Sequence, residues 1–427
     1  MCAMPEWHIE KALTDMRLPH EHLTSQRLRA PVMRSINGIE LLNLIREHGP
    51  ISRASLAKLS CLSKPTVSSQ VETLERQGWI VELGRGESGS KGGKKPTLIR
   101  FNADAGRLFA AEIDAAHVHL ATADLEGRII ERLTIPIGTN RGAASVIATV
   151  RKGLARLIAN QPDDGVQRVI SIAAPGRVDV RLGVVLDAGN LFNWRNVPVR
   201  EQIEAAFGLP VFVDNDVKMA TLGEIQFGVA RGETDVVLVR LDTGIGSGVV
   251  SRGKLLPGSH WAAGEIAHMV LDLSKAGQDW SARGYLESVV GSDRILAQAR
   301  ALGSSASSAI EFLESARTAR GAARKVFDKV VGHLGIAIAH MICAYDPSLV
   351  VLQGGLLASV REELQAIIAN AIPWETRIVF SEIGGEAVLL GTLVAARTQA
   401  YERISRLFDG ASRAVATETG LALNTAG

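Results

Sequence analysis

The 427-residue sequence predicts an α/β protein in two parts, a small N-terminal module of helices and a β-hairpin and a larger, duplicated α/β fold with a cleft between two lobes. Two observations carry this prediction. Three short helical patterns with their own start or stop signals lie between residues 34 and 77, and a strand meander followed by helices occurs twice, after residues 107 and 236. We divide the chain into an N-terminal tail (1–30), the small module (31–101), the two-lobed domain (107–410) and a C-terminal tail (411–427).

The helices of the small module are defined by their ends. The first apolar helical pattern stops at His48-Gly49-Pro50, a combination that helices rarely continue through. Ser52 and Ser63 precede the next two helices, where a serine hydroxyl can accept a hydrogen bond from a free amide of the first turn. The expected helices are 34–48, 53–59 and 64–77, followed by strands 79–83 and 97–101.

The third helix has one apolar and one polar face. Val67, Val71 and Leu74 form a stripe that should dock on the first two helices. The other face carries hydroxyls and cations, which reach phosphates and base edges in a DNA major groove, and the hairpin loop adds lysines that neutralise phosphates. The residues predicted to contact DNA are Arg53, Lys64, Thr66, Ser68, Ser69, Arg76, Lys91, Lys94 and Lys95.

Charge supports this interpretation of the small module as a winged helix-turn-helix. Residues 31–100 hold eleven Lys and Arg against six Asp and Glu, a net charge of +5, while the whole chain has only +2. The alternative is a protein-interaction module with a solvated basic loop. Helices, hairpin and local charge agree on DNA binding, which we therefore favour.

The larger domain shows the same pattern of elements twice. Strands are expected at 108–113, 118–123 and 129–135, with a helix at 143–159 and a buried strand at 169–173. A second meander begins at 236–242 and 248–250, long helices follow residue 286, and one more strand is expected at 349–352. The Ala-rich helix at 318–345 is interpreted as core, with a subunit interface as the alternative.

Composition excludes several classes of protein. Three distant cysteines suggest no disulfide framework, which fits a reducing cytoplasm. The first thirty residues lack the apolar core of a secretory signal, and we expect no run to reach the roughly 18 apolar residues of a membrane span. We therefore expect a cytoplasmic protein that does not enter membranes.

The densest group of polar motifs lies between residues 213 and 287. Asp214-Asn215-Asp216 closes a strand, Asp242 to Gly248 forms a Gly-rich turn, and Glu265, His268 and Glu287 follow. Carboxylates, an amide and an imidazole offer the donors and acceptors that sugar hydroxyls need. Taken alone, each motif is as readily a helix cap or an ordinary hairpin.

In this order, the motifs resemble the ROK family (repressor, open reading frame, kinase) from about residue 34 to 407. Ala174 to Asp179, Asn190 to Trp194, Asp346-Pro347 and Gln353-Gly354-Gly355 share the resemblance. It implies an actin-like ATPase architecture of two RNase-H-like lobes, the sugar-kinase fold. It also implies a set of sugar-binding residues, Gly176, Asn215, Asp216, Glu265, His268 and Glu287, with Asp216 in the position of a kinase's general base.

Two departures from the family weigh against kinase activity and a metal. The kinases' phosphate loop, Asp-x-Gly-Gly-Thr, is replaced by Asp114-Ala115-Ala116-His117-Val118, so Cβ atoms stand where backbone must approach a phosphate. The family's structural zinc needs His268 and three cysteines, but Gln278, Trp280 and Tyr285 occupy the cysteine positions. We expect no zinc and no other cofactor, and we expect the two aromatic residues to hold the loop by packing rather than to stack on sugar.

The leading hypothesis is a DNA-binding transcriptional regulator, a repressor of carbohydrate genes, controlled by a sugar in the cleft. Its partners would be operator DNA and a second copy of the chain, since helix-turn-helix proteins read paired half-sites. One alternative is an active ATP-dependent sugar kinase with an appended DNA-binding domain, which Asp216 favours and the altered phosphate loop opposes. Another is a regulator without a small-molecule ligand.

Overall fold

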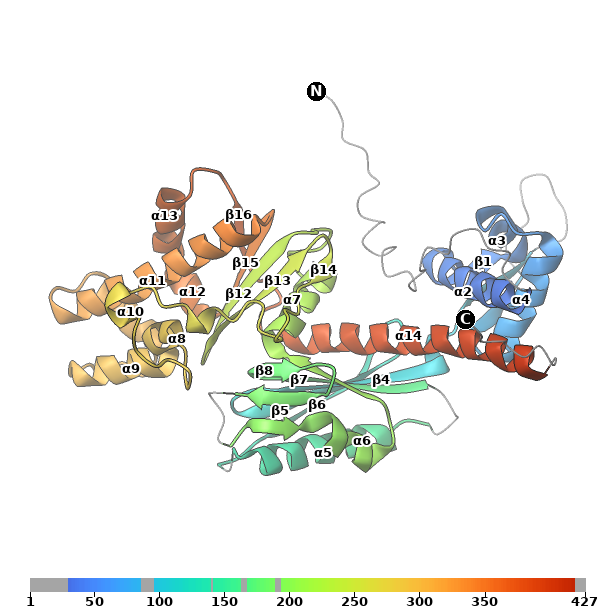
Figure 1. Ribbon diagram of the computed structural model, residues 1–427, viewed down its shortest axis with the longest axis horizontal. Helices are drawn as coiled ribbons and strands as arrows, with labels where there is room; N and C mark the ends of the chain where they lie inside the picture. The colour runs from blue at the N-terminus through green and yellow to red at the C-terminus, as the bar shows by residue number, and fades with distance from the viewer. Residues whose placement is uncertain (1–29, 86–95, 140, 163–166, 189–192, 419–427) are drawn as a thin grey trace, which may run out of the picture.

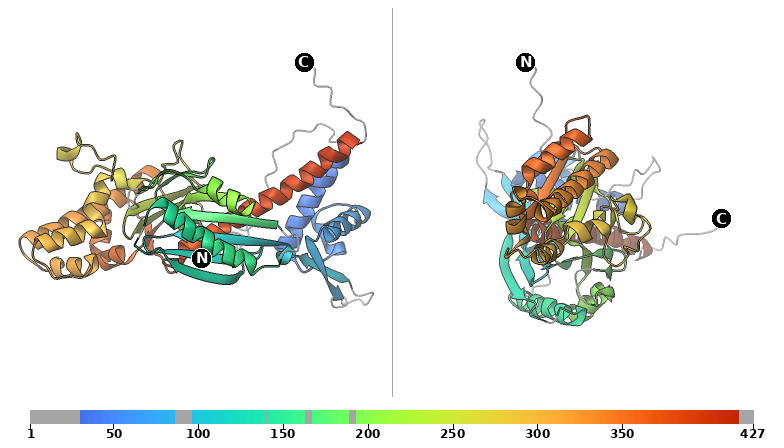
Figure 2. Two further views of the ribbon diagram at one scale, coloured as in Figure 1. Left: turned by 90° about the horizontal axis from the view of Figure 1, so that it is seen from below. Right: turned by 90° about the vertical axis from the view of Figure 1, so that its left-hand side faces the viewer.

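The small module and the two lobes follow one another along an elongated molecule (Figure 1). The structure is a computed structural model and describes residues 30–85, 96–139, 141–162, 167–188 and 193–418. The small module lies at one end, and the helices of the second lobe lie at the other end in both views that show the long axis (Figure 2). The predicted N-terminal tail lies outside the described residues, apart from Ala30.

The small module is the predicted winged helix-turn-helix. Val67, Val71 and Leu74 are fully buried, and the hydroxyls of Ser52 and Ser63 accept hydrogen bonds from amides in the first turns of their helices, as expected. A three-stranded sheet in the order β1-β3-β2 closes the module. Its elements are α2 (Ala30–His48), β1 (Ile51–Ser52), α3 (Arg53–Leu59), α4 (Lys64–Arg76), β2 (Ile80–Arg85) and β3 (Thr97–Phe101).

The first lobe is built on a five-stranded sheet in the order β11-β7-β4-β5-β6. The strands β4, β5 and β6 form an antiparallel meander, and β7 and β11 add on parallel to β4. A side sheet of β8, β9 and β10, which the sequence did not predict, packs beside it. The elements are β4 (Gly106–Ile113), β5 (His117–Ala123), β6 (Ile129–Pro136), α5 (Ala143–Ala159), β7 (Gln167–Ala174), β8 (Arg177–Asp179), β9 (Val184–Asp187), β10 (Arg195–Pro198), α6 (Val199–Phe207) and β11 (Val211–Asn215).

The second lobe repeats this topology. Its sheet has the order β14-β13-β12-β15-β16, again an antiparallel meander with two parallel strands added at the first strand. The predicted duplication is therefore confirmed. The elements are β12 (Val236–Leu241), β13 (Ile245–Ser251), β14 (Lys254–Leu255), α8 (Tyr285–Val290), α9 (Ser292–Ala301), α10 (Ala309–Arg317), α11 (Ala322–Tyr345), β15 (Leu349–Gln353), α12 (Gly355–Ser359), α13 (Arg361–Ala371) and β16 (Arg377–Phe380).

Two long helices cross between the sheets, α7 (Asp216–Phe227) and α14 (Glu386–Glu418). Glycines allow the close crossing, because a Cβ at Gly391 would come within 1.7 Å of the Met219 carbonyl oxygen. From this crossing α14 runs along the first lobe to the small module, where it packs against α2 (Figure 1). One helix thus touches both lobes and the winged helix-turn-helix.

Two expectations need correction. The C-terminal tail was expected from residue 411, but α14 continues to Glu418, since the Ala-rich segment after Gly410 sustains a helix and one internal glycine costs only about 1 kcal/mol. Helix α11 is long and apolar enough to cross a membrane, contrary to the expectation that no segment of the chain would be. More than half of that apolar window is buried within the second lobe against neighbouring helices, as the core interpretation of this segment predicted.

Candidate functional site

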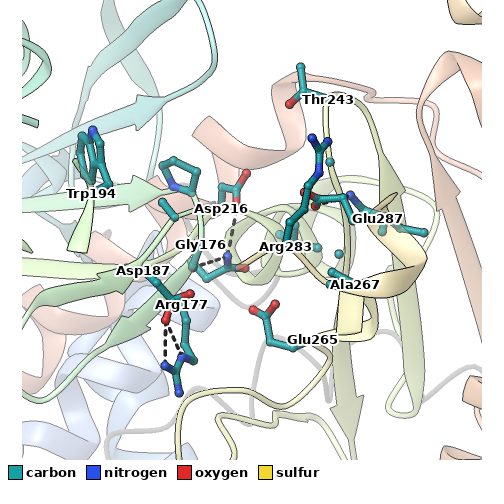
Figure 3. A pocket seen from close by; sticks show the side chains of 18 of the residues that line it. Gly176, Arg177, Asp187, Trp194, Asp216, Thr243, Glu265, Ala267, Arg283 and Glu287 are labelled. Atoms are coloured by element: carbon teal, nitrogen blue, oxygen red, sulfur yellow. Dashed lines mark hydrogen bonds and ion pairs between the residues drawn. The ribbon is translucent and has the colours of Figure 1, made fainter. Parts of the chain in front are cut away.

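A pocket of about 680 Å³ opens between the two lobes (Figure 3). It is lined by the β7–β8 turn, the β11–α7 junction, the β12–β13 turn, the loop before α8 and the start of α8 itself. The structure brings together in this lining all six residues that were expected to hold a sugar: Gly176, Asn215, Asp216, Glu265, His268 and Glu287.

The junction of β11 and α7 fixes the first polar pair. The Asn215 side chain caps α7 by accepting from the Lys218 amide, and its Nδ2 donates to the Gly176 carbonyl at 2.8 Å and to Asp216 Oδ1 at 3.0 Å. Gly176 has a φ of +81°, and a Cβ there would lie 2.1 Å from the Asp187 carbonyl oxygen. Glycine is therefore needed for this turn to pass close to the backbone of Asp187 and Ala188.

Glu265 is held in place by a buried lysine that the sequence analysis missed. Lys218, only 3% exposed, donates from Nζ to the Pro257 carbonyl at 3.2 Å and to the Trp261 carbonyl at 2.9 Å, and so anchors the loop before Glu265. On the other side, the Ser247 hydroxyl and amide both donate to the Gly264 carbonyl. Burial raises the pKa of Glu265, while Lys218 and then His268 oppose that rise.

His268 is less firmly held. It lies on a short 3-10 helix (Ile266–His268) and is exposed, although its charge influences Glu265. The residue lines the pocket as expected, with more freedom than the buried Asn215.

Glu287 enters the pocket from the first turns of α8 and is oriented by an arginine. Arg283 Nε lies 3.0 Å from Glu287 Oε1, and the same guanidinium donates two hydrogen bonds to Asp293, at 2.7 and 2.6 Å. A Cβ at Gly244 would lie 2.6 Å from Glu287 Oε2, so the Gly-rich turn leaves space for this carboxylate. Figure 3 shows Arg283 and Glu287 on the same side of the pocket, across from Arg177 and Asp187.

A cluster of carboxylates surrounds Arg240 at the back of the cleft. Arg240 lies 3.6 Å from Asp216 and 3.7 Å from Asp242. Burial raises the pKa of Glu112 to about 8, with Arg240 opposing the rise and Asp216, Asp114 and Asp242 adding to it. Burial likewise raises the pKa of Asp216, against Arg240. Three acidic groups, Glu112, Asp216 and Asp242, thus share one nearby guanidinium.

The segment at the position of the phosphate loop is a closed hairpin. Asp114 Oδ1 accepts hydrogen bonds from the amides of Ala116 and His117, at 2.6 and 2.5 Å, and the Asp114 amide donates to the His117 carbonyl. Amides that could face a phosphate are therefore bonded within the turn. Burial alone would raise the pKa of Asp114, but these amides and His119 outweigh it and hold the pKa below its ordinary value.

The loop that lacks the zinc cysteines is held by aromatic side chains. Trp280 and Tyr285 pack edge to face with ring centroids 5.1 Å apart, and Trp280 Nε1 donates to the Lys275 carbonyl. The Tyr285 hydroxyl lies 2.8 Å from His333 Nε2 on α11. The predicted packing role is confirmed, and both aromatic residues lie outside the pocket lining.

The exposed face of α4 carries most of the predicted DNA contacts. Lys64, Ser69 and Arg76 are exposed, and Thr66 and Ser68 are partly exposed. Arg53 differs, because its guanidinium lies 2.9 Å from Glu82 and 3.6 Å from Glu75, so it is engaged within the module. Lys91, Lys94 and Lys95 lie outside the described residues.

Comparison with known protein families shows to which family the chain is related. The model of the ROK family matches residues 109–399, and that of the MarR family matches residues 35–82. The chain belongs to the ROK family.

Individual relatives of this ROK protein include regulators and kinases. It is 26% identical to the xylose repressor of Bacillus subtilis, over 84% of this chain and 94% of the relative. It is 25% identical to a glucokinase of Halalkalibacterium halodurans, over only 66% of this chain and 92% of the enzyme. The crystal structure of a ROK family transcriptional regulator, described as a homologue of the Escherichia coli MLC protein, superposes with a TM-score of 0.69 at 24% identity, over 88% of this chain and 98% of that one.

These comparisons confirm the predicted fold class, a winged helix-turn-helix followed by a ROK sugar-kinase-like domain.

Four charged residues that shape the site were not predicted from the sequence, namely Glu112, Lys218, Arg240 and Arg283. The first three stand in otherwise apolar strands or helices, where charged residues are rarely buried without partners. That rule could have marked them as functional or structural from the sequence alone. Arg283 lies in a loop and gives no such signal.

Proposed function

We propose that this protein is a sugar-responsive, DNA-binding transcriptional repressor. The observation that carries the proposal is the combination, in one chain, of a winged helix-turn-helix with a polar pocket in which an amide, an imidazole and three carboxylates converge. Relatives named as repressors share both parts, whereas the glucokinase relative matches two thirds of the chain.

The pocket suits a neutral polyhydroxylated ligand. Asn215, Asp216, Glu265 and Glu287 supply the acceptors and donors. Three of them are already held by a neighbouring group, Asn215 by Gly176, Asp216 by Asn215 and Glu287 by Arg283. Pre-positioned acceptors lose little entropy when a sugar binds. The sugar contacts are therefore assigned to these four residues, with Gly176 and His268 at the edge.

Kinase activity is not part of the proposed function. The amides of Ala116 and His117, at the position of the kinases' phosphate loop, donate to Asp114 and are therefore not free to hold a phosphate. Asp216 consequently acts in sugar binding rather than as a base.

Helix α14 supplies a mechanical connection between the pocket and the DNA-binding module. Near its start it crosses α7, whose first residue is Asp216, and further along it packs against α2. There the Arg46 guanidinium lies 3.6 Å from the centre of the Tyr401 ring, and the Tyr401 hydroxyl donates to the Leu125 carbonyl of the first lobe. A change in lobe arrangement on sugar binding would thus alter the placement of the recognition helices. The repressor acts as a homodimer on paired half-sites in the cytoplasm.

The test joins DNA selection with ligand screening on the full chain. Purified protein selects duplexes from a random library, and the enriched site is then titrated in the presence of hexoses, pentoses, N-acetylated sugars or ATP–Mg. We expect an inverted repeat to be enriched, one sugar class to raise the melting temperature and weaken DNA binding, and ATP–Mg to do neither.

Asp216→Asn should abolish the response to sugar while retaining DNA binding, and Glu362→Gln, at an exposed position of α13, serves as the matched control. Stabilisation by ATP–Mg together with sugar phosphorylation would overturn the proposal in favour of the kinase. If no DNA sequence is enriched, the proposed role as a DNA-binding regulator is wrong.

A further inference from the structure

A second cluster of metal-binding side chains lies at the edge of the pocket, on the hairpin between β4 and β5. Ligand atoms of Asp114, His117 and His119 all lie within 4.8 Å of one another. Asp114 is in the turn and also lines the pocket, and the two histidines are the first and third residues of β5. The residues of this hairpin are those that replace the glycines and threonine of the kinases' phosphate loop.

Strand geometry places both histidines on one face. Val118 and Leu120 pack into the core beneath α5, so His117 and His119, which alternate with them, point to the opposite side of the sheet. Each of the three side chains is about one third to one half exposed. A hydrated ion can therefore reach the cluster, and water can fill coordination positions that the protein leaves open.

The distances are close to those of a metal site. His119 Nε2 lies 2.9 Å from Asp114 Oδ2, and His117 Nδ1 lies 3.9 Å from Asp114 Oδ1. Ligands bound about 2.0–2.2 Å from a tetrahedral zinc ion are about 3.3–3.6 Å apart, so small side-chain movements suffice.

The supporting contacts also suit a metal. Asp114 Oδ1 is fixed by two amides, which leaves Oδ2 directed at His119. On the far side of the His119 ring, Nδ1 lies 3.1 Å from the Thr134 hydroxyl. When that hydroxyl accepts from Nδ1–H, it orients the ring and leaves Nε2 for the ion, the outer-shell arrangement typical of metal-binding histidines.

We propose that Asp114, His117 and His119 form a binding site for a divalent transition-metal ion of the zinc class. Two imidazoles and one carboxylate favour zinc, cobalt or nickel over calcium or magnesium, which prefer oxygen ligands alone. The ion takes Asp114 Oδ2, His119 Nε2 and a nitrogen of His117, with water in the remaining positions. The site is separate from the family's zinc position at His268.

The experiment measures zinc and cobalt binding to the full chain by calorimetry, and the coordination geometry by the absorption spectrum of bound cobalt. We expect one ion per chain. His117→Ala and His119→Ala should each weaken binding about tenfold or more, and Thr134→Val should weaken it about 10-fold while Thr134→Ser retains it. His117→Ala leaves the Asp114–His119 and His119–Thr134 contacts in place, so this variant remains informative if His119→Ala fails to fold.

Two controls separate this site from other histidines. One replaces His8, His20 and His22 near the N-terminus by Ala, and the other is His340→Ala, at an exposed position of α11. Both should bind like the unmodified chain. Loss of binding in either control, equal affinity in His117→Ala, or no stoichiometric binding at micromolar metal would overturn the proposal. If no metal binds, the Asp114–His119 contact serves only to stabilise the hairpin. Binding is measured without DNA or sugar, so its outcome is independent of the proposed repressor function.

Discussion

Replacement of Lys218 by Met should weaken sugar binding from outside the ligand's own contacts. Lys218 is 3% exposed and donates to the carbonyls of Pro257 and Trp261 in the loop that leads to Glu265. Methionine has a similar length and no charge, so the change removes both hydrogen bonds with little change in packing volume.

The expected size of the effect follows from these two bonds. A hydrogen bond to a charged donor contributes about 1.5–3 kcal/mol, and an unsatisfied buried carbonyl costs about 1–3 kcal/mol. Pro257 is exposed and Trp261 is half-buried, so water can replace part of the loss. Ordering the loop when sugar binds then costs about 1.5–3 kcal/mol, which corresponds to roughly 10- to 150-fold weaker affinity.

Calorimetric titration with the sugar found in the ligand screen measures this loss. Lys254→Met, at an exposed position of the neighbouring strand β14, is the matched control and should bind sugar normally. DNA binding without sugar should be the same in both variants. Unchanged sugar affinity in Lys218→Met would refute the idea that this lysine positions Glu265.

Three further predictions concern stability. Because burial raises the pKa of Glu112 from 4.5 to about 8, the folded state binds a proton that the unfolded state has lost between these values, and stability should fall as the pH rises from 5 to 8, by at most about 1.4 kcal/mol per unit. In melting curves recorded between pH 5 and 8, Glu112→Gln should make the stability depend less on pH. If the pH dependence is unaltered, it arises from groups other than Glu112. Ser63→Ala removes the N-cap of α4 and should cost about 1 kcal/mol in denaturant unfolding, with a weaker DNA complex, whereas equal midpoints would contradict the capping role. Tyr285→Phe removes the hydroxyl contact to His333 and should lower stability by about 1 kcal/mol, measured the same way, without changing sugar affinity.

The sequence by itself determined much of the fold, because the signals involved are local. Serine caps and the apolar stripe of Val67, Val71 and Leu74 specify the helices of the small module within a few residues. The repeated meander indicated the duplication, which the identical strand orders of the two sheets bear out. Short edge strands such as β8 and β14 were missed, since two or three residues carry too little periodicity to be recognised.

For the pocket, the sequence supplied the residue types and their order, and the tertiary structure decided their environment. Asn215, Glu265 and Glu287 are far apart in the chain, and they meet because the two sheets face one another across α7. Arg240, buried among carboxylates from both lobes, acquires its role only from that packing. The same holds for the pairing of Asp114 with His119 and for the path of α14 to the DNA-binding module, because side-chain geometry and long-range contacts are absent from any local pattern.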